Sequence, residues 1–190
     1  LDVFGFVTLD GSFAFKKATG DFTLADATTL EDVPYLAIGA SIETATVGAG
    51  SVGLELSDIE VAMVLVSDTK GNNTGATPVL TDDVSYTAIR AQVTDAEIVG
   101  ITGLTVSVTD FALEINQSKN NDGTAGATVL DFDDGNDPNL LALEVATGPS
   151  TTATIDLDGG EGQLLQVAGA ISLDVFGFVT LDGSFAFKKA

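Results

Sequence analysis

The sequence contains no cysteine, no histidine and no tryptophan. Without Cys and His there is no thiol nucleophile, no imidazole base and no zinc site of the Cys/His kind, so a Ser-His-Asp triad is excluded as well. The absence of Cys also excludes disulfides. Packing, sheet hydrogen bonds and bound cations are therefore the means by which this chain can be stabilised.

Basic residues are scarce, with 7 Lys and Arg against 28 Asp and Glu, and the net charge is −21. Such a chain repels nucleic acid and anionic membranes, so we expect no nucleic-acid partner. No apolar run approaches the ~20 residues of a membrane helix, and we expect no membrane insertion. Hydrophobic residues make up 45% of the chain, which excludes a disordered spacer.

Pairs of carboxylates are the chemistry of glycoside hydrolysis, but 28 acidic residues produce such pairs by chance. An aromatic-lined sugar cleft is not indicated, because the chain has only two tyrosines, Tyr35 and Tyr86. We therefore expect that the protein is not an enzyme and has no catalytic residue.

One segment occurs twice. Residues 1–18 read LDVFGFVTLDGSFAFKKA, and residues 173–190 read the same eighteen letters, so the sequence repeats with a period of 172 residues. A duplication of this length predicts a tandem array. In this interpretation residues 1–172 are one repeat unit, and residues 173–190 are the start of the next identical unit.

Alternating apolar and polar residues mark long strands over 54–65, 104–115 and 171–187. Clusters of Gly, Asn, Asp and Pro, such as those at 67–78 and 133–139, indicate turns between them. The pattern predicts an all-β fold of long-stranded antiparallel sheets. A β-sandwich, a barrel and a roll-like form are all compatible with it, repeating along the array.

A weaker repeat lies inside the period. Residues 33–65 align with 84–115, placing Tyr35 on Tyr86 and Asp58 on Asp110. The alignment slips where the alternation breaks, which predicts a bulge on a long strand. Residues 162–190 resemble the same pattern, so we expect three sub-repeats of about 57 residues, each a pair of long strands.

The duplicated segment is rich in phenylalanine. Phe13, Phe15, Phe185 and Phe187 alternate with smaller residues, which favours core packing in a sheet. Phe176 and Phe178 lie on the opposite parity from Val175 and Val179, so both faces are apolar in that stretch. These two residues and their copies in the first segment are therefore predicted to contact the neighbouring repeat: Phe4, Phe6, Phe176 and Phe178. Discrete domains strung in tandem are the alternative to a sheet that runs from one unit into the next; we favour contact between units.

Two acidic segments are candidates for Ca²⁺, the one cofactor that the sequence suggests, because hard oxygen ligands crowd on Gly-containing loops. The candidate ligands are Asp131, Asp133, Asp137 and Asn139 in the first segment and Asp156 and Asp158 in the second. Neither segment has the spacing of an EF-hand or of a calcium β-roll. Plain acidic turns that keep the surface solvated are the alternative.

The segments ISLDVFGFVTLDGSFAFKKA and GLTVSVTDFALEINQS, together with the acidic, Cys-free, periodic character, resemble the tandem repeats of giant bacterial surface or adhesin-like proteins. The resemblance implies a secreted structural repeat at the cell surface or outside the cell. It would act as an extender or fibre-forming segment, with identical repeats as partners and self-association into a filament as a further outcome. A carbohydrate- or surface-binding adhesive module is the alternative.

Overall fold

The computed structural model describes residues 1–3, 5–69, 83–132 and 140–190. It consists almost entirely of antiparallel strands, which confirms the predicted all-β fold. The elements are β1 (Asp2–Val3), β2 (Val7–Thr23), β3 (Thr29–Ala49), β4 (Val52–Asp68), β5 (Val84–Val99), β6 (Leu104–Asn120), β7 (Leu143–Ala146), β8 (Thr152–Ile155), the 3₁₀ turn η3 (Gly159–Glu161), β9 (Leu164–Val175) and β10 (Val179–Lys189).

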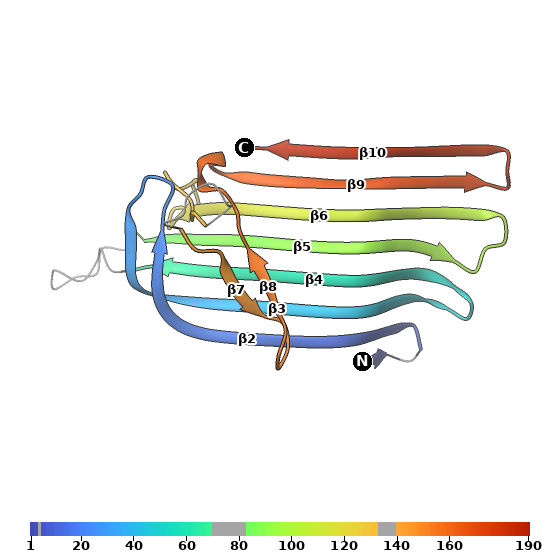
Figure 1. Cartoon of the computed structure of the whole chain (residues 1–190), viewed down its shortest axis with the longest axis horizontal. Coiled ribbons are helices and arrows are strands. Elements are labelled where there is room, and N and C mark those ends of the chain that lie inside the picture. The colour runs from blue at the N-terminus through green and yellow to red at the C-terminus, as the bar shows by residue number, and fades with distance from the viewer. Residues whose placement is uncertain (4, 70–82, 133–139) are drawn as a thin grey trace.

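Eight strands form one sheet in the order β1-β2-β3-β4-β5-β6-β9-β10, and every neighbouring pair is antiparallel. The long strands lie side by side in a single layer (Figure 1). Only the step from β6 to β9 skips elements of the chain, and the segment between them carries the small hairpin β7–β8. The sheet is open, because no described strand pairs β2 with β10.

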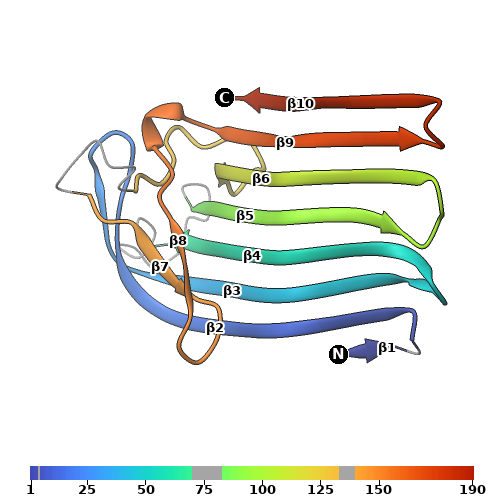
Figure 2. The same cartoon turned by 45° about the vertical axis from the view of Figure 1, so that its right-hand side comes forward.

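The hairpin β7–β8 is a second layer over one half of the sheet. It crosses in front of β2–β5, while the half that holds the turn between β9 and β10 has no such layer among the described residues (Figures 1 and 2). We call the side that carries this hairpin the hairpin face, and the opposite side the open face.

The main core lies between the hairpin and the sheet. Val64 from β4, Ala88 from β5 and Ile155 from β8 are fully buried in one cluster. Close approach requires a glycine in β3, because a Cβ on Gly39 would lie 2.1 Å from the carbonyl oxygen of Ala146. The ring of Phe22 meets Tyr35 edge-on with centroids 5.3 Å apart, which is a favourable aromatic geometry.

A row of irregularities crosses the four central strands. Asp58 in β4 and Asp110 in β6 have left-handed backbone, with φ of 49° and 51°, which Asp tolerates better than most residues. Glu43 in β3 and Thr94 in β5 drop out of the pairing ladder at the same level. Register shifts against β2 and β9 mark the two sides of this row. The predicted bulge is confirmed at Asp58 and Asp110.

The bulges keep the apolar residues on one side of the sheet. Along each of these strands the apolar spacing changes from two to three at this row, as between Leu56 and Ile59 or between Val108 and Phe111. Without the extra residue of a bulge, this spacing would place the apolar side chains of each strand on opposite faces before and after the row. Leu56 and Ile59 instead lie in one cluster with Ile42, so both sides of the row share a face.

That shared face is the open face. Val64 and Val66 point into the core under the hairpin, so Met63 and Leu65 point to the opposite side. The larger apolar residues assigned to the open face by alternation and register include Leu9, Phe13, Phe15, Leu36, Ile38, Ile42, Val47, Leu54, Leu56, Ile59, Val61, Met63, Leu65, Ile89, Val93, Ile98, Val108, Phe111, Leu113, Ile115, Leu165, Val167, Ile171, Leu173, Leu181, Phe185 and Phe187.

The expectation that the phenylalanines of the duplicated segment pack in a core is wrong for the single chain. Phe15 is 71% exposed and Phe187 is 55% exposed, and Phe13 and Phe185 are exposed as well. The physical reason is that alternation assigns a residue to a face but does not tell whether a second layer covers that face. The hairpin β7–β8 covers the other side.

Candidate functional site: the edge hairpins and the acidic loops

The duplicated segment forms the same hairpin at both edges of the sheet. Asp2 pairs with Thr8 in the first copy as Asp174 pairs with Thr180 in the second. The turns also match, since the amide of Gly5 donates to the Asp2 carboxylate at 2.8 Å and the equivalent bond to Asp174 is also 2.8 Å. The two hairpins have different neighbours: β2 continues the sheet through β3, and β10 is reached from β6 through β9.

Both edges of the sheet offer unpaired backbone. The outer edge of β2 is covered by only two residues of β1 and by Leu1, and β10 has no described neighbour beyond β9. Unpaired edges of this length are templates for another strand. All of β10 from Val179 to Lys189 is exposed.

One side chain of the duplicated segment makes different contacts at the two edges. Lys188 forms an ion pair with Glu161 beside β9. Its equivalent, Lys16, places its ammonium group 5.8 Å from the ring centroid of Tyr35 in β3, within the range of a cation–π contact. If one strand paired with β9 on one side and with β3 on the other, this lysine would lie near both the equivalent of Glu161 and the equivalent of Tyr35.

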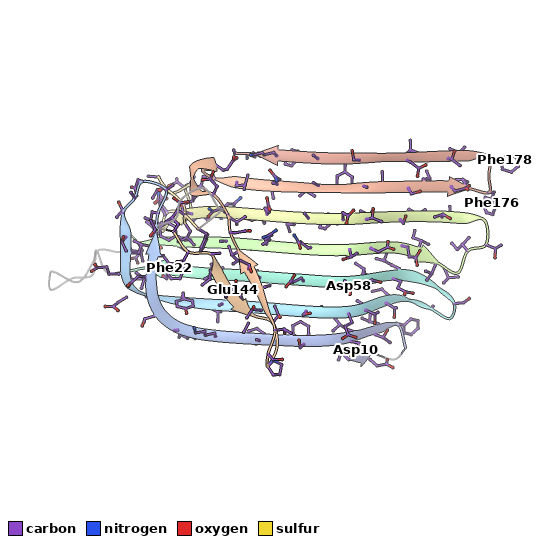
Figure 3. The ribbon with its side chains drawn as sticks, in the orientation of Figure 1. Asp10, Phe22, Asp58, Glu144, Phe176 and Phe178 are labelled. Carbon is purple, nitrogen blue, oxygen red and sulfur yellow. The ribbon has the colours of Figure 1, made fainter. Side chains whose placement is uncertain are left out.

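The four phenylalanines predicted to contact the next repeat belong to hairpin turns. Phe176 and Phe178 lie at the far end of the sheet in the turn between β9 and β10 (Figure 3), and Phe178 is 90% exposed. The amide of Phe176 donates to the carbonyl of Gly103 at 2.5 Å, so this turn is tied to the β5–β6 turn of the same chain. Phe6 is exposed in the equivalent turn, and Phe4 lies outside the described residues. Their contact with a neighbouring repeat stays a prediction.

The described candidate calcium ligands each have a protein partner. Asp156 accepts a hydrogen bond from Arg90 at 2.5 Å. Asp131 accepts the amide of Gly159 at 2.7 Å, and Asp158 caps the turn η3 by accepting the amide of Gly160 at 2.6 Å. Within the described ranges no three His, Cys, Asp or Glu side chains gather as a metal site.

The other three candidate ligands, Asp133, Asp137 and Asn139, lie outside the described residues. If their loop binds Ca²⁺ with the submillimolar to millimolar dissociation constant of extracellular sites, 10 mM Ca²⁺ will stabilise the fold by about 1.5–3 kcal/mol. The measurement is thermal unfolding in Ca²⁺ and in EDTA, with Mg²⁺ as the control ion. Coincident melting curves in Ca²⁺ and EDTA would contradict the calcium prediction.

Two further carboxylates act as turn-forming groups. The hydrogen bond from the amide of Thr28 holds the pKa of Asp26 below its usual value, and the hydroxyl of Thr124 does the same for Asp122. Both aspartates are exposed and accept from residues two positions ahead, the geometry of an Asx turn. They support the reading of such acidic clusters as turns.

Two features were missed in the sequence. The ion pair of Lys188 with Glu161 had no sequence signal, because it depends on the pairing of β10 with β9 and on the turn η3 that precedes β9. The apolar open face did have a sequence signal, which is the spacing of three between apolar residues at the bulges once those bulges are aligned across the strands.

Among the described residues, no helix is long and apolar enough to cross a lipid bilayer. Comparison with protein-family models, with curated proteins and with solved structures gave no match to this chain.

Proposed function

We propose that this chain is a structural repeat that extends a β-sheet along a tandem array, as an extender or fibre-forming segment of a bacterial surface protein outside the cell. The observation that carries the proposal is the identical register of the duplicated hairpin at the two edges of the sheet. If β10 of one period is β2 of the next, a single strand pairs with β9 on one side and with β3 on the other.

The strand count supports this continuation. One period contributes β2, β3, β4, β5, β6 and β9, which is six strands. Because all neighbours are antiparallel and six is even, β10 runs in the same direction as β2, as the next period requires. With strands ~4.8 Å apart, each period would lengthen the sheet by about 29 Å.

Other features suit an extending role. The hydroxyl of Ser12 donates to the carbonyl of Thr147 at 2.8 Å, so each hairpin β7–β8 also touches the first strand of its own period. The charge of −21 keeps arrays apart and soluble. The Cys-free composition suits a secreted location.

The adhesive alternative stays a prediction, to be tested by binding to a glycan array.

The test is a chain of two periods with cysteines placed on either edge of the shared strand. The native sequence has no Cys, so each engineered pair is unique. On the β9 side, the pair is S172C with D182C, whose native side chains hydrogen-bond at 2.7 Å. On the β3 side, the pair is T180C of the first period with T46C of the second, since Thr8 and Thr46 touch through their hydroxyls within one copy.

We expect each disulfide to form completely when its pair is introduced alone, and electron microscopy to show rods that lengthen by about 29 Å with each added period. The matched control is T8C with T46C in the first period, which must form in either arrangement. Formation of only one of the two disulfides on the shared strand would mean separate beads and would overturn the proposal.

A further inference from the structure

The open face of the sheet is apolar across every long strand. One row, joined by direct register, consists of Phe15, Ile38, Met63, Ile89, Ile115 and Leu165. Many residues of this face keep large exposed fractions, such as 40% for Leu54 and 37% for Leu65. Contiguous apolar surface beyond a few hundred Å² is rare on a monomer and marks an interaction site.

Over the length from Leu36 to Val47 of β3 and along the strands paired with it, the alternating positions of this face carry no carboxylate, in a chain with 28 acidic residues. Asp21 and Glu31 lie on this side outside that area, and the bulges add Glu43, Asp58 and Asp110 in one row. Most other acidic residues of the strands lie on the hairpin face. Glu55 and Glu97 are directly opposite each other there, and Glu60 lies beside Ala62 under the hairpin. The charged residues of the open face are lysines near one end, such as Lys17 and Lys189. A second copy therefore meets the least repulsion on this side.

The size of the open face matches a stable protein interface. Seven long strands at ~4.8 Å span roughly 34 Å, and the apolar rows from Leu36 to Val47 of β3 run for roughly 36 Å, so the face covers on the order of 1,200 Å². A standard interface needs about 800 Å² from each partner. Sheets pack face to face ~10 Å apart through side chains of this kind.

We propose that the open face is an interface between two copies of this chain, which pack sheet against sheet and turn their hairpin faces outward. Each copy supplies the second layer that the other lacks, and the exposed phenylalanines of the duplicated segment become core residues. This inference does not rest on the proposed function, because the open face is complete within one chain.

The experiment measures the molar mass of the 190-residue chain by sedimentation equilibrium. At about 100 µM, above the micromolar dissociation constants that interfaces of this size show at their weakest, we expect twice the chain mass of 19.3 kDa. The double variant Leu54→Glu/Leu65→Glu places two carboxylates on the open face of β4, at positions exposed enough for the monomer to fold. Because those charges would be buried without partners, we expect the dissociation constant to rise at least a hundredfold.

The control variant is Ser57→Glu, on the same strand but on the hairpin face, beyond the part that the hairpin covers. It should leave the dimer unchanged. Circular dichroism and urea unfolding show that each variant keeps its fold, and edge pairing through β10 would be insensitive to both changes. A monomeric wild-type chain, a dimer that survives Leu54→Glu/Leu65→Glu, or equal dissociation in the control would overturn the proposal. So would a monomer that instead binds neutral lipid vesicles, because the face would then take lipid.

Discussion

Deleting Asp58 is expected to destabilise the protein by about 3 kcal/mol, because this residue is the extra one that keeps β4 apolar on one side. Without it, Leu54 and Leu56 would move to the hairpin face and Glu55 would enter the open face, unless β4 lost its pairing with both neighbours. Each leucine withdrawn from apolar surroundings costs up to about 1.5–3 kcal/mol. Urea unfolding at low protein concentration measures the change.

The matched control for the deletion is Asp58→Gly. It keeps the extra residue and relieves the left-handed backbone at φ 49°, so we expect it to stabilise the fold by about 0.5–1 kcal/mol. If the deletion lowers the unfolding free energy and Asp58→Gly raises it, the presence of the extra residue matters and its carboxylate does not. Figure 3 shows the place of Asp58 in the sheet. Equal destabilisation by both changes would contradict this account of the bulge.

Ile155→Ala is expected to cost about 3–4 kcal/mol of unfolding free energy. Ile155 is fully buried where β8 packs on β4 and β5, in the cluster that joins the hairpin to the sheet. Removing three carbons there leaves a cavity under a two-stranded element that is not stable by itself. Hydrogen exchange should show the amides of β7 and β8 losing protection before those of β4.

The control is Leu141→Ala, which removes an aliphatic side chain that is 83% exposed just before β7. Its effect should stay within about 0.5 kcal/mol. A loss below 1 kcal/mol in Ile155→Ala would mean that the hairpin contributes little to stability, and that the long sheet stands without its second layer.

Much of the local structure follows from the sequence. Alternation identifies the long strands, and its break at Asp58 and at Asp110 identifies the bulges, because side-chain direction is a property of each strand alone. Less of the candidate site could be predicted from the sequence. The duplicated segment signals a repeat, but the position of its two copies at opposite edges of one sheet becomes visible only when β9 is known to lie beside β6.

The sequence by itself therefore determined the strands, their two faces, the bulges and the 172-residue period. The tertiary structure alone decided which strands are neighbours, where the hairpin β7–β8 lies, and hence which apolar face remains open. The physical reason is the range of the forces involved. Alternation and turn formation act between residues close in sequence, whereas the seating of the hairpin depends on burial between segments such as Ile155 and Val64, far apart along the chain.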